Sequence, residues 1–116
     1  MPDKLTPLQA AQLAALETFP PRFQQVHRMI EELASLRADP SLVQRLSRLL
    51  DQTKAVAHSL GESGMADTLG IMAMLSRRRG DHQMRVRGLR EGLLSLKFHY
   101  ETAVRLIREN RLGRVR

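Results

Sequence analysis

Residues 86–107 read VRGLREGLLSLKFHYETAVRLI, and the apolar residues among them recur at intervals of three and four. An α-helix has about 3.6 residues per turn, so this spacing places them on one face of a long amphipathic helix. Gly88 and Gly92 lie one turn apart on it, which predicts that a neighbouring helix approaches closely there. The predicted apolar stripe consists of Val86, Leu89, Leu93, Leu96, Tyr100, Ala103 and Ile107.

Upstream of this helix, capping signals divide the chain into further helices. Thr6 and Gln9 stand three residues apart around Pro7, the pattern of a capping box with proline in the first turn. They predict a first helix that ends at Phe19, because Pro20-Pro21 should stop it. Its predicted apolar side chains are Leu8, Ala11 and Leu16.

Two helices with the same apolar periodicity are expected next. One runs from about Arg22 to Leu36, and the other opens at the cap-then-proline pair Asp39-Pro40. The predicted apolar faces are Phe23, Val26, Met29 or Ile30, Leu33 and Leu36 on the first, and Val43, Leu46, Leu50, Thr53, Ala57 and Leu60 on the second.

The small residues of the segment 61–64 interrupt this pattern, so the fourth helix is expected to begin at a cap supplied by Asp67 or Thr68. Gly80 should end it and Asp81 should cap the final helix. Its core positions are Leu69, Met72 and Leu75, and its last turn holds Arg77, Arg78 and Arg79, where cations complement the helix dipole.

The composition agrees with a purely helical fold. The chain has 116 residues, 42% of them hydrophobic and only 3% aromatic, which suits one domain with a core of Leu, Val, Ile, Met and Ala. We therefore predict an all-α domain over residues 1–116, an antiparallel four-helix bundle with a short N-terminal helix packed across it. Met65, Met72, Met74 and Met84 are interpreted as flexible core residues.

Several classes of protein are disfavoured by the sequence. There is no cysteine, which rules out disulfides and thiolate chemistry. No apolar run approaches the roughly 20 residues of a membrane span, and the N-terminus lacks the pattern of a signal peptide, so we expect a cytoplasmic protein. No phosphate-binding glycine loop or serine nucleophile arrangement is found. His27, His82 and His99 show neither HxxxH nor HExxH spacing, so no metal site is expected.

Basic residues are concentrated in the last third of the chain. Residues 1–75 carry seven Lys/Arg and eight Asp/Glu, whereas residues 76–116 carry twelve and four. This asymmetry predicts attraction to an anionic surface, whether an acidic protein, a nucleic acid or lipid headgroups.

His58 is the residue with the clearest chemical potential. It follows the predicted core residue Ala57, so it should lie about 100° from the buried stripe and be at least partly exposed. Its neighbours on the same helix face are Asp51, Lys54, Gly61 and Glu62.

The run Ala57-His58-Ser59-Leu60-Gly61-Glu62-Ser63-Gly64 resembles the active helix of the histidine phosphotransfer domains of two-component phosphorelays. The resemblance covers about residues 20–107, leaves a basic tail at 108–116, and implies a four-helix bundle with an exposed histidine. That histidine would carry a phosphoryl group between aspartates of receiver domains. The matching positions are Ala57, His58, Ser59, Leu60, Ser63 and Gly64, with Met72 and Leu75 at apolar positions of the next helix.

The sequence departs from the family at two positions beside the histidine. Gly61 replaces a lysine that helps to hold the phosphoryl group, and Glu62 replaces a glycine that gives the receiver room to dock. Lys54, one turn earlier, is the candidate to supply the missing charge. By this resemblance His58 is the phosphoryl acceptor, and the partner is a receiver domain or a hybrid histidine kinase that brings its own Mg²⁺. The candidate binding residues are Lys54, Ser59, Gly61, Glu62, Ser63, Gly64, Arg77, Arg78 and Arg79.

Two other functions are compatible with the same residues. The chain could be a helical adaptor that binds an acidic partner without phosphotransfer, with the heptad of the final helix also able to pair two copies. It could instead bind nucleic acid through its arginine-rich end, although it has no aromatic stacking platform and no helix-turn-helix pattern.

Overall fold

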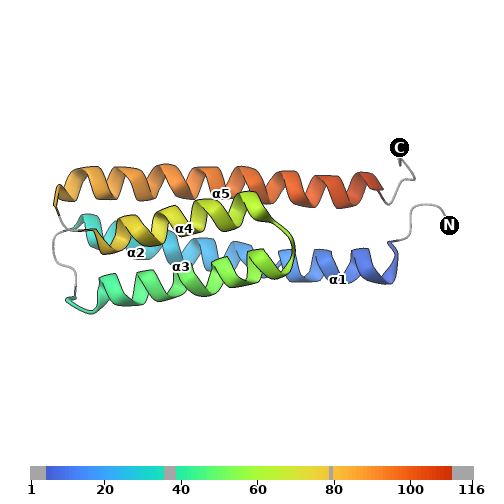
Figure 1. Cartoon of the computed structure of the whole chain (residues 1–116), viewed down its shortest axis with the longest axis horizontal. Coiled ribbons are helices and arrows are strands. Elements are labelled where there is room, and N and C mark those ends of the chain that lie inside the picture. Colours follow the sequence, from blue (N-terminus) through green and yellow to red (C-terminus); the bar gives the residue numbers. More distant parts are fainter. Residues whose placement is uncertain (1–4, 36–38, 79, 111–116) are drawn as a thin grey trace.

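In the computed structural model, the described residues are 5–35, 39–78 and 80–110, and they form five α-helices and no strand (Figure 1). The helices are α1 (Pro7–Leu16), α2 (Phe19–Ala34), α3 (Leu42–Ser59), α4 (Ser63–Arg77) and α5 (His82–Asn110). The predicted all-α fold class is therefore confirmed for this part of the chain.

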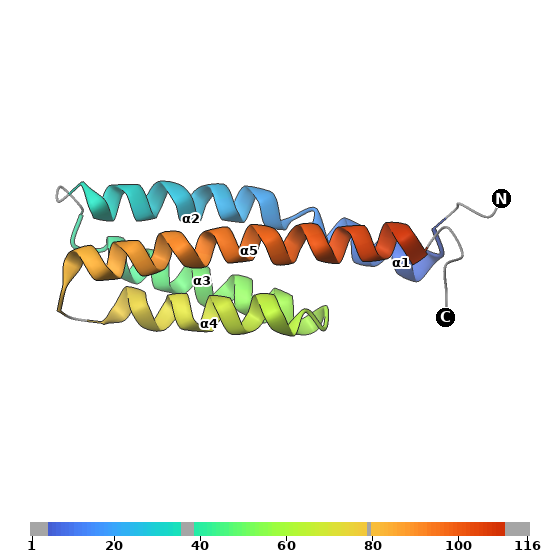
Figure 2. The same ribbon diagram turned by 90° about the horizontal axis from the view of Figure 1, so that it is seen from above.

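Helices α2 to α5 lie side by side, and each runs opposite to the one before it (Figures 1 and 2). Contacts link α2 to α3, α3 to α4, α4 to α5, and α5 back to α2, so the four helices close into a ring around a common core. The most extensive contact joins α3 and α4, which form a hairpin. A bundle of this kind buries one face of every helix, as the apolar periodicity requires.

The core is built from the apolar faces that the sequence predicts, with few exceptions. Tyr100 and Ile107 of the α5 stripe, and Val43 and Leu60 of α3, are only partly buried at its edge, whereas Leu42 is fully buried although it was not predicted. Leu36 lies outside the described residues. The buried apolar side chains include Phe19, Phe23, Val26, Ile30, Leu33, Leu42, Leu46, Leu50, Ala57, Leu69, Met72, Val86, Leu89, Leu93, Leu96 and Ala103.

The first helix departs from the prediction in its position and in its buried face. It continues the line of α2 beyond the end of the α3–α4 hairpin and packs on the C-terminal part of α5, instead of crossing the bundle (Figure 2). Because α5 is the main neighbour of α1 among the described helices, only a narrow strip of α1 is buried. Of its three predicted apolar residues, Leu16 is buried and Leu8 and Ala11 are exposed.

The proline pair starts a helix instead of stopping one. The predicted end of the first helix at Phe19 is wrong, since α1 ends at Leu16 and Phe19 is the first residue of α2. Pro20 and Pro21 then occupy the first turn of α2, where backbone N–H groups have no acceptor within the helix and none is lost.

Other boundaries follow the capping signals more closely. Thr6 and Gln9 form the predicted capping box, with reciprocal hydrogen bonds of 3.0 Å, and the Asp81 carboxylate accepts from the amides of Gln83 and Met84 at the start of α5. Helix α4, however, begins at Ser63, so the predicted cap at Asp67 or Thr68 is wrong.

The methionines divide into two groups. Met65 and Met72 are buried in the core, as predicted. Met74 and Met84 are 69% and 61% exposed, so they are not core residues.

The predicted close approach at the two glycines of α5 is present. A Cβ atom on Gly92 would lie 2.6 Å from Met72 Cγ and 2.8 Å from its sulfur, and a Cβ on Gly88 would lie 2.9 Å from Leu75 Cδ1. Helix α4 therefore packs directly against the backbone of α5, which only glycine permits at these distances.

Replacing Gly92 with alanine should destabilise the fold. Its methyl group would meet the stem of the fully buried Met72, and overpacking of this kind costs about 1–3 kcal/mol, only partly offset by the better helix propensity of alanine. Urea unfolding should show a net loss of up to about 2 kcal/mol. The matched control is Gly88→Ala. The new methyl group there would meet only a terminal carbon of the half-buried Leu75, and that carbon can rotate away. The free energy of unfolding of Gly88→Ala should therefore differ from that of wild type by less than about 0.5 kcal/mol. Equal losses in the two variants would contradict this description of the α4–α5 contact.

An ion pair joins α2 to α5 on the surface. The Arg90 guanidinium donates to both carboxylate oxygens of Glu31, at 2.9 and 2.7 Å. These hydrogen bonds and the positive charge of Arg90 lower the pKa of Glu31 from its ordinary value of 4.5. The contribution to stability is small because both side chains are about half exposed.

This ion pair predicts a pH-dependent difference between wild type and Glu31→Gln. Because the pKa of Glu31 is lower in the folded state, the stabilisation is complete above 4.5 and disappears as pH falls through the lowered value. The melting temperature of Glu31→Gln should thus lie slightly below wild type at neutral pH and coincide with it well below pH 4.5. Glu32→Gln, at the next position on α2, serves as the control and should show no such convergence.

Candidate functional site

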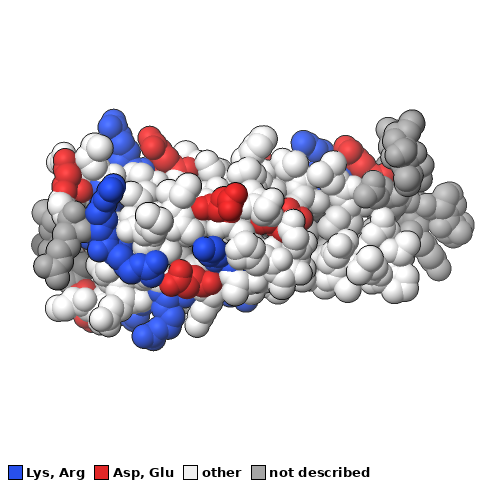
Figure 3. All heavy atoms as spheres, viewed as in Figure 1, with Lys and Arg blue, Asp and Glu red and all other residues white. Residues whose placement is uncertain are grey.

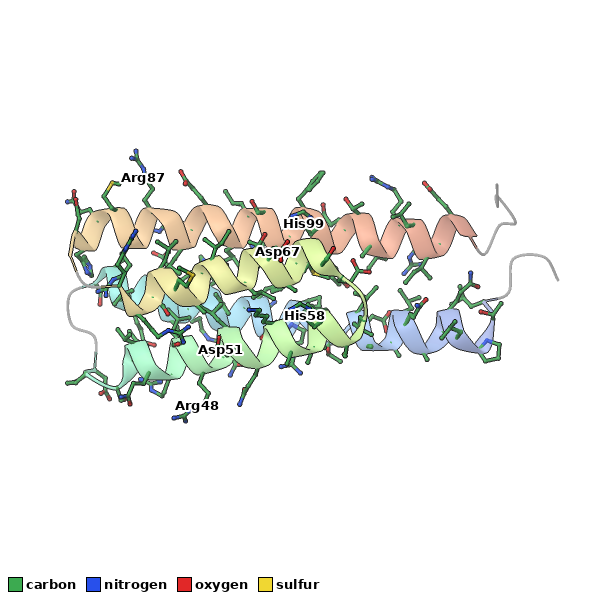
Figure 4. The ribbon with its side chains drawn as sticks, viewed as in Figure 1. Arg48, Asp51, His58, Asp67, Arg87 and His99 are labelled. Carbon is green, nitrogen blue, oxygen red and sulfur yellow. The ribbon has the colours of Figure 1, made fainter. Side chains whose placement is uncertain are left out.

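His58 lies in the last turn of α3, close to the turn that leads into α4 (Figure 4). Its side chain is exposed, and its ring makes no hydrogen bond or ion pair with any other described residue. The neighbouring Ala57 is fully buried, so α3 is held firmly against the core at this point. The expectation that the imidazole reaches solvent from a packed helix is confirmed.

Gly61 has a structural role that explains its presence beside the histidine. Its φ is +73°, in the left-handed region that favours glycine. Its amide donates to the carbonyl oxygen of His58 at 3.0 Å, and the Glu62 amide donates to Ala57 at 2.9 Å, the hydrogen-bond pattern of a Schellman motif. A lysine at this position would have to adopt the same strained backbone, so Gly61 serves to end the helix.

Gly64, one of the candidate binding residues, lies in the first turn of α4 and is half-buried. A Cβ atom on it would lie 3.1 Å from Cε1 and Nδ1 of His99, a half-buried side chain of α5. The ring of His99 therefore packs on the Gly64 backbone, and this glycine serves the α4–α5 contact.

Lys54, one turn before His58, leans across the α3–α4 hairpin. A Cβ atom on Gly70 would lie 3.2 Å from Lys54 Nζ and within 4 Å of its Cε and Cδ. The absence of a side chain on Gly70 thus lets the lysine stem lie on α4, with its ammonium group at the edge of the hairpin. Lys54 stays within one turn of His58, but its position is set by packing on α4.

The arginines proposed to attract a partner lie farther away and are partly used inside the chain. Arg77 donates to the carboxylate of Asp51 at 3.1 Å and to the hydroxyl of the buried Ser47, which ties the end of α4 to α3. Asp51 is seven residues before His58, about 10 Å along the helix axis. Arg78 is exposed, and its carbonyl oxygen accepts from the Arg85 guanidinium. Arg79 lies outside the described residues.

The remaining predicted residues surround the end of α3. Ser59 is exposed and its hydroxyl donates to the carbonyl oxygen of Val56, and Ser63 is exposed at the start of α4. Glu62 lines a small cavity of about 120 Å³ between the α3–α4 turn, α1 and α5. The structure therefore brings together Lys54, Ser59, Gly61, Glu62, Ser63 and Gly64 near His58, and separates Arg77 and Arg78 from them.

A groove between α2 and α5 was not predicted from the sequence. It measures about 450 Å³ and has an aromatic wall in which Phe23 and Tyr100 meet edge to face, with ring centroids 6.0 Å apart. The signal in the sequence was an aromatic residue on the apolar stripe of each helix. The lining residues are Pro20, Phe23, Gln24, His27, Arg28, Lys97, Tyr100 and Glu101.

Metal-binding clusters and membrane-spanning helices are both absent from the described residues. No group of three or more histidine, aspartate or glutamate side chains converges on a point where a metal ion could bind. None of the helices has the length and apolar character required to cross a bilayer.

Comparison with protein-family models, with curated proteins and with solved structures gives no match for this chain.

The left-handed conformation of Gly61 predicts a specific response to substitution. Gly61→Ala should lower the free energy of unfolding by about 1 kcal/mol, because an L-residue pays for φ near +73° even though a Cβ there meets no atom within 4 Å. Gly61→Asn should lose less, since asparagine adopts this conformation more readily. Urea denaturation of the two variants would measure the difference, and an alanine variant as stable as wild type would contradict the assigned cap.

Proposed function

We propose that the chain is a histidine-containing phosphotransfer protein that carries a phosphoryl group on His58 between aspartates of receiver domains. The observation that supports this most directly is the exposed, unbonded imidazole on the outside of the α3–α4 hairpin. Phosphoryl transfer from a receiver requires an accessible nitrogen nucleophile on a rigid support, while the receiver contributes the acidic cluster and Mg²⁺.

The transfer needs little else from the carrier. An unprotonated ring nitrogen attacks the phosphorus of the aspartyl phosphate, and the N–P bond forms as the bond to the carboxyl oxygen breaks and the aspartate leaves as a carboxylate. The return transfer reverses the same bonds, so no redox partner or resident cofactor is involved. The role of this chain is to hold the imidazole in position and to leave space for the receiver.

The surroundings of His58 provide part of that space. Ser59, Gly61 and Ser63 are exposed and carry short side chains or none, so a flat protein surface could approach the ring from the α3–α4 turn. Lys54 is the cation nearest to His58 along α3, and we assign it the role of stabilising the incoming phosphoryl group.

A second candidate function is docking on a receiver or kinase without phosphotransfer. It is favoured by the conformation of Gly61, which removes the family lysine, and by the nearby carboxylate of Glu62. Binding would then depend on the basic residues at the opposite end of the hairpin. Lys and Arg gather at that end on the face in Figure 3, and Arg48 and Arg87 project from it in Figure 4. Such attraction to an acidic partner would weaken with salt.

The test uses a panel of receiver domains from the same genome, each loaded with radiolabelled phosphate. Wild type should take up label from at least one receiver, and His58→Gln should abolish uptake while its circular dichroism and melting temperature remain those of wild type. His27→Gln, which replaces an exposed histidine on α2, is the matched control and should retain uptake. Lys54→Ala should reduce the rate by about tenfold or more if the ammonium group stabilises the transferred phosphoryl group.

The same panel separates the two functions. Labelling of His58→Gln as strongly as wild type would exclude His58 as the acceptor. If wild type binds a receiver in calorimetry but takes up no label, the chain is a docking protein. If it neither binds nor takes up label from any receiver, both proposals fail.

A further inference from the structure

The outer face of α5 carries large apolar side chains that no part of the described chain covers. The predicted pairing of two copies through the heptad of this helix is not available, because that stripe is buried in the bundle. On the opposite side, however, Leu94 is 67% exposed and Phe98 is 64% exposed. They lie four residues apart, so their side chains are neighbours on the outer surface.

Charged residues flank Phe98 in an antisymmetric pattern. Glu91 lies seven residues before it and Arg105 seven residues after it, while Arg87 lies eleven before and Glu109 eleven after. Seven and eleven residues are about two and three turns, so all five side chains belong to one stripe. All of them are exposed, and at each distance from Phe98 the two charges have opposite signs.

These four charged side chains form no ion pair with any described residue. The ion pairs among the described residues are Arg77 with Asp51 and Arg90 with Glu31, neither of which involves this stripe. Even Arg87 and Glu91, one turn apart, form no ion pair with each other. Figure 4 shows Arg87 pointing away from α3 and α4, into solvent.

We propose that the outer face of α5 is the contact surface of a homodimer in which two copies of this helix pack antiparallel about a two-fold axis through Phe98. In this antiparallel pairing, a residue that precedes Phe98 by a given number of positions in one copy lies beside the residue that follows Phe98 by the same number in the other copy. Glu91 then meets Arg105 and Arg87 meets Glu109, each twice, around the two Phe98 rings at the axis, and Leu94 of each copy lies beside Thr102 of the other. A parallel pairing in register would oppose like charges instead. The inference is independent of the role of His58.

Charge reversal with rescue tests the pairing directly. In sedimentation equilibrium, wild type should be a dimer that weakens as salt increases. Glu91→Arg and Arg105→Glu should each raise the dissociation constant by about tenfold or more, because each opposes like charges twice in the dimer. The double variant exchanges the charges and should restore dimerisation. Glu32→Arg, on the exposed side of α2, is the control and should have no effect.

A single cysteine provides a second, geometric measurement. The chain has no cysteine, so Phe98→Cys introduces one thiol per copy at the proposed axis. Mild oxidation should link it into a covalent dimer, whereas Met74→Cys on α4, a position of similar exposure, should remain unlinked. A wild type that stays monomeric at high micromolar concentration, or a double variant that fails to recover, would overturn the proposal.

Discussion

The close contact between α4 and the backbone of α5 determines how the other helices are arranged. At Gly92 the stem of Met72 occupies the space where any other residue would carry its Cβ, and at Gly88 the end of Leu75 does the same. This contact sets the rotation of α5 about its own axis. The heptad stripe is thereby turned toward the core, and Leu94 and Phe98 are turned to solvent. The burial of one face and the exposure of the other thus have a single cause.

The same contact extends toward the candidate site. At the far end of the α4–α5 interface, the ring of His99 packs on Gly64, directly after the turn that joins α3 to α4. That turn is held by the left-handed Gly61 and by the hydrogen bonds it closes onto the last turn of α3. His58 belongs to this last turn, so its position is defined by backbone geometry on one side and by the buried Ala57 on the other. The position of His58 is therefore well defined, and Gly61 is required for the turn that follows it.

The arginines in the last third of the chain have different structural roles. Arg77 and Arg90 join helices to one another by ion pairs with Asp51 and Glu31. Arg87 and Arg105 stand on the outer stripe of α5 with acidic residues interspersed, an arrangement suited to a self-complementary surface. Net charge alone therefore overstates how much positive potential is available to a nucleic acid or to an acidic partner, because part of it is neutralised locally.

The amino-acid sequence by itself determined the fold class, most of the buried faces of α2 to α5, the caps at Thr6 and Asp81, the glycines that admit α4, and the exposure of His58. These features depend on local periodicity and on backbone chemistry, which can be read from neighbouring residues. Only the tertiary structure decided that α1 extends α2, that Lys54 lies on Gly70, that His99 covers Gly64 and that Arg77 reaches Asp51. Each of these features depends on which helices become neighbours and at what offset, and residues far apart in the chain meet only after the core has packed. The same holds for the outer face of α5. Its symmetric charges indicate a contact surface only once the opposite face of the helix is known to be buried in the core.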